Sequence, residues 1–327
     1  MKATLLLTAV LLLLISCGRN KDSGSSDRPE NYGNGHSYFT YPYNPSYPYN
    51  PAIYPYPYPN PYLHPIPVPE VNPVLRFPPG TPLRVRLEGR QVGAHQGGAI
   101  DLAGNTIHRF EEAYQYGADI VEMDLQITKD GVIIVYHDNY LERFTNCTGL
   151  VADKTWAEIQ KCDKLFFYKI NSLEEVLKWS NGKIIINAEF KFISSVVPAI
   201  KIVQKYNAYD WVYFQTKSDP AIYQAARDFD PDIALLFAPN NMDQLNWALE
   251  LDDENLVIIE LNKEFRSTEI IDAIHDAGKL VSENAWHFSS VHEAFGAACE
   301  PLFKMNIDIA ITDKTPSCIR QREDLED

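Results

Sequence analysis

The stretch ADIVEMDLQITKDGVIIVYHD, residues 118–138, decides the fold. It contains two apolar runs, Ile120–Asp124 and Val132–Tyr136, separated by little more than Thr128-Lys129-Asp130-Gly131. A parallel crossover needs about a dozen residues or more, whereas Asp-Gly between two apolar runs is typical of a tight hairpin turn. The second run is therefore predicted to be a hairpin arm that no helix connects to the first.

Strand-like and helix-like segments alternate through the rest of the chain, which predicts a parallel sheet. The other strand-like runs are Val92–His95, Ile184–Glu189, Trp211–Gln215, Ile233–Phe237, Leu256–Glu260, Lys279–Ser282 and Ile307–Thr312. The helix-like segments include Ile107–Tyr116, Ser172–Ser180, Val196–Tyr206, Asp219–Phe229, Met242–Leu249, Thr268–Ala277 and Ser290–Met305.

Without the hairpin arm, eight strands remain over about 240 residues, the usual size of a (β/α)8 barrel. We therefore expect an α/β fold, a TIM barrel over residues 83–327 with a small hairpin insertion after the second strand. An open doubly wound sheet is the alternative. It is less favoured because the Gly-rich phosphate loops typical of that fold are absent from the sequence.

Glu122 and Asp124 are two residues apart on a predicted strand, so both side chains face the barrel interior. Two buried like charges repel unless a cation lies between them, and hard oxygen ligands suit Mg²⁺ or Ca²⁺. Glu189 and Lys191 alternate in the same way and could add a third carboxylate and a phosphate-binding ammonium group. Taken alone, Glu189 and Lys191 are more simply interpreted as a strand-end ion pair.

His95 ends the first predicted strand and His137 ends the hairpin arm, and the active sites of barrels lie at the carboxyl ends of strands. Two imidazoles that flank a carboxylate pair could act as general acid and general base near neutral pH. The remaining histidines are interpreted as structural: His36, His64, His108, His275, His287 and His292.

The N-terminus is predicted to be a signal peptide, residues 1–16, with Lys2 before the apolar run Leu5–Ile15. Leu14-Ile15-Ser16-Cys17 resembles a bacterial lipobox, in which Cys17 becomes lipidated, and an ordinary signal peptide is the alternative. This pattern predicts an exported protein of the bacterial cell envelope, lipid-anchored to a membrane on the outer-membrane or periplasmic side.

Residues 17–82 are predicted to form a Pro/Tyr-rich disordered stalk, since most of the 22 prolines lie between residues 37 and 82. Proline fixes φ and removes a backbone donor, which favours polyproline II over helix or sheet. The alternative is a ligand for a proline-binding protein partner, whose identity the composition does not reveal.

The net charge of −15 and the absence of a basic block argue against nucleic acid as a partner. Apart from Cys17, four cysteines allow three disulfide pairings, which sequence alone does not distinguish. The pairing with the shortest loops joins Cys147 to Cys162 and Cys299 to Cys318, and free buried thiols are the alternative.

The motifs resemble those of the glycerophosphodiester phosphodiesterase family, in the PLC-like phosphodiesterase superfamily, across most of residues 92–315. The matching segments are His95-Gln96-Gly97, Gly104-Asn105-Thr106, Glu122-Met123-Asp124, His137-Asp138, Glu189-Phe190-Lys191 and Ile311-Thr312-Asp313. The resemblance implies a metal-dependent hydrolase that converts glycerophosphodiesters to glycerol 3-phosphate and an alcohol. By position, it implies His95 and His137 as the acid/base pair, the three carboxylates as Mg²⁺ or Ca²⁺ ligands, and Lys191 as a phosphate contact.

Two positions depart from the family pattern. Gln96 replaces an arginine, so it can hydrogen-bond a phosphate oxygen but brings no charge. Gly104 replaces a metal-binding glutamate, for which Asp101 could substitute. A softer departure is Ser282-Glu283-Asn284, near a Trp-Thr-Val-Asn segment of the family, where the asparagine persists and the tryptophan does not.

These departures leave two alternatives open. Related sphingomyelinase D-like phospholipases also look built on three carboxylates, two histidines and a lysine, so a phospholipase D-like activity on intact lipids is one alternative. The other is a catalytically weakened lipoprotein that binds a phosphorylated ligand, which the changes at Gln96 and Gly104 suggest.

Overall fold

The computed structural model describes residues 76–98, 104–164 and 168–326. The predictions of a signal peptide over residues 1–16, lipidation at Cys17 and most of the 17–82 stalk lie outside these ranges and stay predictions. The same is true of Asp101 as a substitute metal ligand. Among the helices of the described ranges, we found none with the length and apolar character needed to cross a membrane.

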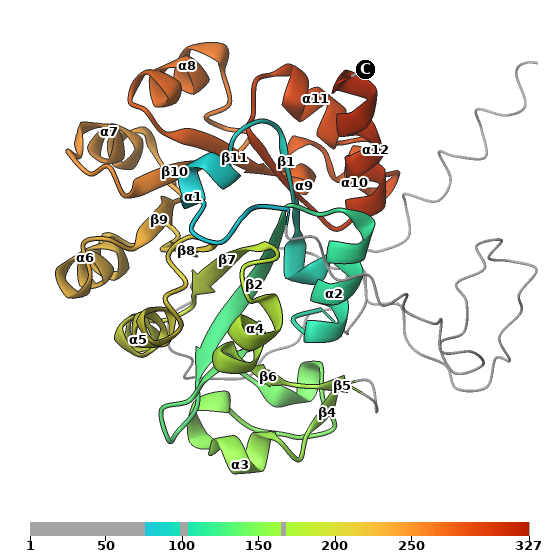
Figure 1. Ribbon diagram of the computed structural model, residues 1–327, viewed down its shortest axis with the longest axis vertical. Coiled ribbons are helices and arrows are strands. Elements are labelled where there is room, and N and C mark those ends of the chain that lie inside the picture. The colour runs from blue at the N-terminus through green and yellow to red at the C-terminus, as the bar shows by residue number, and fades with distance from the viewer. Residues whose placement is uncertain (1–75, 99–103, 165–167, 327) are drawn as a thin grey trace, which may run out of the picture. The chain divides into compact units, whose positions relative to one another are not determined.

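Eight parallel strands form a closed barrel, which confirms the predicted TIM barrel and excludes the open sheet (Figure 1). The strands are β1 (Gln91–Ala94), β2 (Ile120–Ile127), β7 (Ile185–Phe190), β8 (Val212–Gln215), β9 (Ala234–Phe237), β10 (Leu256–Leu261), β11 (Leu280–Asn284) and β12 (Ile309–Thr312). Strand β1 closes the barrel because it pairs in parallel with both β12 and β2.

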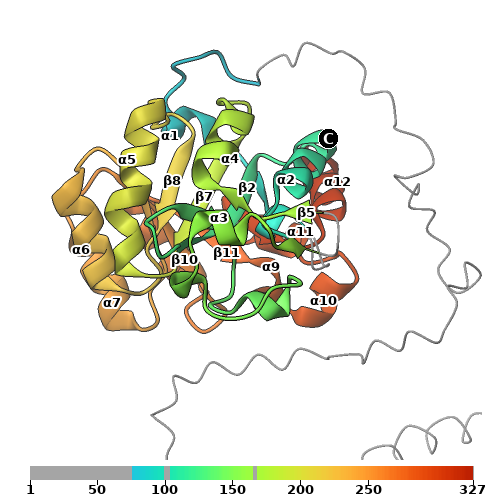
Figure 2. The same cartoon turned by 90° about the horizontal axis from the view of Figure 1, so that it is seen from below.

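Helices surround the barrel, and Figure 2 shows α5, α6 and α7 side by side on its outside. The longer helices are α2 (Ile107–Tyr116), α4 (Leu173–Ser180), α5 (Val196–Tyr206), α6 (Pro220–Phe229), α7 (Met242–Glu250), α8 (Thr268–Asp276), α11 (Cys299–Lys304) and α12 (Thr315–Glu326). The short helices are α1 (Leu83–Arg86), α3 (Trp156–Ile159), α9 (Ala285–Phe288) and α10 (Ser290–Ala294).

The prediction of one helix over Ser290–Met305 was wrong, because α10 and α11 are separate. Gly296 lies between them with φ +66°, a left-handed conformation that ends a helix at little cost only for glycine. Helix α12 was not predicted, because its exposed face is polar and gives little apolar periodicity.

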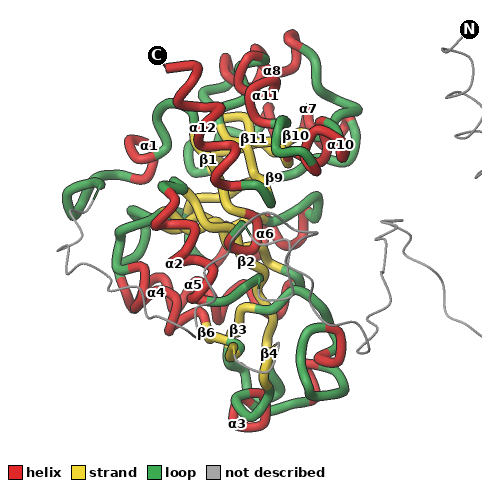
Figure 3. The backbone as a smooth tube through the Cα atoms, turned by 90° about the vertical axis from the view of Figure 1, so that its right-hand side faces the viewer, coloured by secondary structure: helices red, strands yellow, loops and turns green. Residues whose placement is uncertain are grey.

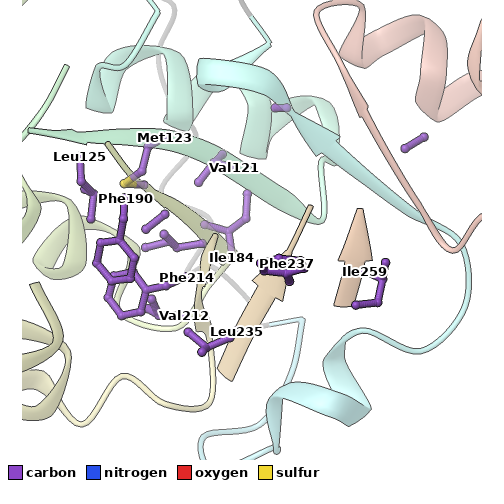
Figure 4. Packing of buried hydrophobic residues seen from close by; sticks show 14 of the residues in the cluster. Val121, Met123, Leu125, Ile184, Phe190, Val212, Phe214, Leu235, Phe237 and Ile259 are labelled. Atoms are coloured by element: carbon purple, nitrogen blue, oxygen red, sulfur yellow. The ribbon is translucent and has the colours of Figure 1, made fainter. Parts of the chain in front are cut away.

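The two faces of β2 carry different kinds of side chain. Val121, Met123 and Leu125 point outward and pack in the cluster shown in Figure 4. In the same cluster, the rings of Phe190 and Phe214 stack with their centroids 4.5 Å apart. Alternation along the strand therefore directs its carboxylates into the barrel, as the sequence predicted.

The segment inserted after β2 is larger than the predicted hairpin. Strand β3 (Ile133–Val135) pairs antiparallel with β2, and β6 (Asn171–Ser172) pairs antiparallel with β3. Between them lie α3 and the strand pair β4 (Asp163–Lys164) and β5 (Tyr168–Lys169). Figures 1 and 3 both place these elements together at one end of the domain.

The inserted segment has a small core of its own, which includes Tyr136, Leu141 and Ile159. A disulfide between Cys147 and Cys162 closes its loop. A second disulfide joins Cys299 in α11 to Cys318 in α12. The structure thus contains the pairing with the shortest loops, and not free thiols.

Candidate active site

Three buried carboxylates converge at the carboxyl ends of two neighbouring strands. Glu122 and Asp124 come from β2, and Glu189 comes from β7, where it lies directly opposite Asp124 in the strand register. One oxygen from each carboxylate lies within 4.8 Å of the others. Only 2–9% of each residue is exposed. A set of three hard oxygen donors fits Mg²⁺ or Ca²⁺, which would offset the mutual repulsion of the carboxylates.

Asp124 and Glu122 have opposite pKa shifts. Burial, followed by the charge of Asp124, raises the pKa of Glu122 to about 8. Burial alone would also raise the pKa of Asp124, but the charges of Lys191 and His137 outweigh it and hold that pKa well below its usual range. Asp124 is therefore ionised at neutral pH, whereas Glu122 holds a proton unless a cation replaces it.

Two lysines lie against the carboxylates. The Nζ atom of Lys191 is 2.5 Å from Asp124 Oδ1 and also bonds Glu189 Oε1. The Nζ atom of Lys217, in the loop after β8, is 2.7 Å from the same oxygen of Glu189. Lys191 thus bridges two strands, which is more than the simple strand-end ion pair that the sequence alone suggested.

His95 directly follows β1 and is held from two sides. Its Nδ1 atom hydrogen-bonds Asp313 Oδ1 at 2.8 Å, and its Nε2 atom lies 3.9 Å from Glu122 Oε2. Its ring packs on Trp286, with centroids 4.5 Å apart. Burial by itself lowers the pKa of His95, but the hydrogen bond to Asp313 and the charge of Glu122 raise the pKa to about 9.

His137 lies two residues beyond β3, at the same end of the barrel. The backbone N–H of the preceding residue, Tyr136, donates to the carbonyl of Asp124 at 2.9 Å. His137 Nδ1 hydrogen-bonds Asp138 Oδ1 at 2.5 Å, and Arg143 in turn pairs with Asp138. Both imidazoles are close enough to Asp124 that their charges lower its pKa.

A sequence model of the glycerophosphoryl diester phosphodiesterase family matches residues 95–315. This chain belongs to that family. The match covers the strands and loops that carry the carboxylates, the lysines and both imidazoles, so the predicted family membership is confirmed.

Curated relatives match over shorter segments. A glycerophosphodiester phosphodiesterase from Caldanaerobacter subterraneus is 36% identical over 127 residues, 35% of this chain and 52% of that protein. One from Bacillus altitudinis is 40% identical over 110 residues, 31% of this chain and 45% of that protein. The chain spans about half the length of these curated relatives.

Solved structures of the family share the fold of this chain. A glycerophosphodiester phosphodiesterase from Agrobacterium tumefaciens has a TM-score of 0.62 at 20% identity, covering 71% of this chain and 99% of its own. A phosphodiesterase from Oleispira antarctica, in complex with the product sn-glycerol-3-phosphate, has a TM-score of 0.61 at 19% identity. The match covers 72% of this chain and 97% of that chain.

The two departures from the family pattern lie side by side in this structure. Gln96 has φ +49°, and its N–H donates to Glu122 Oε2 at 2.9 Å. A Cβ atom added to Gly104 would lie 3.0 Å from Gln96 Oε1 and 3.1 Å from Gln96 Cβ. The Gln96 side chain therefore borders the space that a larger residue 104 would enter. Next to it, Asn105 Nδ2 donates to Asp124 Oδ2 at 2.7 Å and keeps that carboxylate in place.

Sequence reasoning assigned no role to several residues that the fold brings to the site. Asp313, Trp286 and Lys217 were missed, although each follows a barrel strand closely. Glu260 of β10 was also missed; burial, followed by the charge of Glu189, raises its pKa to about 8. These residues could have been found from the sequence as polar or aromatic residues at, or just beyond, the end of a predicted strand.

At one fixed concentration, about 100 times the Kd at pH 8, added Mg²⁺ or Ca²⁺ is expected to raise Tm by roughly 5–10 °C at pH 8 and by less at pH 6, where protonation of Glu122 weakens binding. Because the pKa of Glu122 is raised, the contribution of this residue to the stability of the metal-free fold is lost as pH rises from about 4.5 to about 8. A bound cation removes this loss because it favours the ionised carboxylate. Thermal unfolding at both pH values, with EDTA as reference, checks the prediction.

Glu122→Gln should remove the pH dependence of this gain, because an amide does not titrate. Asp228, an exposed acid in α6, offers a matched control, and Asp228→Asn should behave as the wild type. Equal gains at the two pH values in the wild type would contradict the prediction.

Proposed function

We propose that this protein hydrolyses phosphodiesters with the help of a divalent cation, and that glycerophosphodiesters are its substrates. The observation that carries the proposal is the convergence of Glu122, Asp124 and Glu189 beside two imidazoles at one end of the barrel. Membership of the family supports the same reaction class. The products would be sn-glycerol 3-phosphate and an alcohol.

The three carboxylates would hold the cation, which would polarise the phosphoryl oxygens when bound. Lys191, anchored between Asp124 and Glu189, is in position to contact a phosphate oxygen next to that cation. Gln96 would add an uncharged hydrogen bond. These groups bind and orient the phosphodiester between the imidazoles.

His95 is the better candidate for the general base. When the His95 imidazole is neutral, its Nδ1–H donates to Asp313, and its Nε2 lone pair can take a proton from water or from a neighbouring substrate hydroxyl. Attack by such a hydroxyl would give a cyclic phosphate first. In the same step His137, whose Nδ1 is hydrogen-bonded to Asp138, would protonate the leaving alkoxide. Water would then open a cyclic phosphate, with the two imidazoles exchanging the roles of acid and base. The proton taken at one imidazole is thus balanced by the proton given at the other.

A substrate panel tests the proposal. The full chain would be incubated with glycerophosphocholine, lysophosphatidylcholine and sphingomyelin, each with Mg²⁺ or Ca²⁺. We expect product from glycerophosphocholine. Product only from the two lipids would instead support the phospholipase D-like activity. No product from any of them, with cation binding intact, would support a protein that binds a phosphorylated ligand without turnover.

Restoring the family residues tests whether the site is weakened. Gly104→Glu combined with Gln96→Arg is expected to raise Mg²⁺ affinity and kcat/KM about tenfold, since an anionic ligand and a charged phosphate contact return. Gly104→Ala is the matched control, because it adds only the Cβ atom that crowds Gln96. If the double variant gains nothing over Gly104→Ala, the site functions without these two residues.

A further inference from the structure

Lys217 occupies an unusual backbone position at the carboxyl end of the barrel. Its φ of +51° is left-handed, which residues with a Cβ atom rarely adopt unless the surrounding structure imposes it. Its carbonyl accepts a hydrogen bond from Ala238 N at 2.9 Å, and the preceding Thr216 N donates to Leu236 O at 2.9 Å. The loop after β8 is thus tied to β9 and to the residue that follows it, which fixes where the Lys217 side chain starts.

Two ammonium groups share one carboxylate oxygen. Lys217 Nζ is 2.7 Å from Glu189 Oε1, which Lys191 also bonds. The Lys191 side chain is 11% exposed, whereas that of Lys217 is 48% exposed. Lys217 therefore faces both the carboxylate cluster and the solvent from which a substrate would arrive.

We propose that Lys217 is a phosphate-binding residue, which supplies at the β8 loop the positive charge that Gln96 lacks. This assignment rests on the proposed function, because it places the substrate phosphate over the cluster of Glu122, Asp124 and Glu189. With a divalent cation bound, that cluster and the two ammonium groups of Lys191 and Lys217 would carry one net positive charge. A phosphodiester carries one negative charge, so the loaded site and the substrate would match.

A purely structural ion pair explains Lys217 less well. Glu189 already has Lys191 as a buried partner, and an exposed second pair adds little stability. The neighbouring acid Glu260 accepts hydrogen bonds from Gln215 and Asn284. A cation that takes the Glu189 oxygen would repel both ammonium groups, and a phosphate oxygen next to the cation would attract them.

Calorimetric titration of the full chain with sn-glycerol 3-phosphate, at saturating Mg²⁺, tests this role without turnover. Lys217→Met is expected to weaken binding about tenfold, and Lys217→Arg to bind within about threefold of the wild type. Lys205→Met is the matched control, because Lys205 is 59% exposed and pairs with Glu174 at 3.0 Å on the outside of the barrel. Gln96→Arg in the Lys217→Met background should recover most of the lost affinity.

The assignment is overturned if Lys217→Met binds sn-glycerol 3-phosphate as the wild type does, if Gln96→Arg gives no recovery, or if the wild type does not bind. The assignment would also be overturned if Lys217→Met changed only the affinity for Mg²⁺, titrated without phosphate, and not the affinity for sn-glycerol 3-phosphate. That result would indicate only an ion pair with Glu189. Failure of the proposed function is distinct: the wild type would then bind the phosphate but hydrolyse no phosphodiester in the substrate panel.

Discussion

Asp124→Ala is expected to lower kcat/KM for glycerophosphocholine by at least about a thousandfold, equivalent to about 4 kcal/mol of transition-state stabilisation. Asp124 is one of the three candidate ligands, and its low pKa keeps it ionised at every pH where the enzyme would work. It is also the carboxylate that holds Lys191 at 2.5 Å and accepts from Asn105. Its loss therefore disturbs cation binding and the phosphate contact together.

Kinetics with glycerophosphocholine and calorimetry with Mg²⁺ measure both consequences. Asp124→Asn keeps the shape of the side chain and removes only its charge, so it should lose nearly as much activity as the alanine variant while remaining folded. Asp228→Ala, in an exposed acid of α6, should retain wild-type kinetics. An Asp124→Asn variant with wild-type kcat/KM would show that this carboxylate does not serve the reaction.

Asp313→Asn is expected to lower kcat at pH 7 by about a hundredfold and to move the pH profile. Asp313 orients His95 through Nδ1. Against the effect of burial, this hydrogen bond and the charge of Glu122 together raise the pKa of His95 to about 9, so a base at His95 gains activity as pH rises toward that value. A bound cation would offset the charges of Glu122 and Asp124, and would therefore shift the rising limb of the pH–rate profile to lower pH. The neutral amide of Asp313→Asn should shift this rising limb to still lower pH. The less well oriented imidazole should reduce the maximal rate that the profile reaches.

Asp308→Asn offers a matched control for this measurement. Asp308 pairs with His275 at 2.8 Å, as Asp313 pairs with His95, but it precedes β12 whereas Asp313 follows it. The control therefore removes an equivalent His–Asp pair at the other end of the same strand. Rates compared from pH 5.5 to 9.5 should show a shifted limb only for Asp313→Asn; identical profiles would argue against His95 as the base.

Local patterns in the sequence were sufficient for most of the fold. Asp130-Gly131 predicted the hairpin. When the hairpin arm is left out of the strand count, the eight parallel strands of the barrel remain, as in the structure. The size of the insertion was not predictable in this way. Its core, which includes Tyr136 and Ile159, and its two-residue strands form through contacts with little periodicity in the sequence.

The residues of the candidate site also fall into two groups, those that the sequence could predict and those that only the fold brings together. Glu122 and Asp124 could be predicted as a pair, because a strand places alternate residues on one face. The partners of His95 could not, since Asp313 is 218 residues away and Trp286 lies on a short helix after a different strand. Lys217 reaches Glu189 only because β8 pairs with β7.

The sequence by itself therefore determined the strand count, the hairpin and the inward carboxylates of β2, because these depend on periodicity and turn chemistry within a few residues. Only the tertiary structure decided which charges meet. Barrel closure brings the ends of β1, β2, β7, β8 and β12 together. The resulting burial raises the pKa of Glu122, and the resulting contacts with Asp313 and Glu122 raise the pKa of His95. Burial and distance between remote segments are properties of the closed barrel, which no local pattern records.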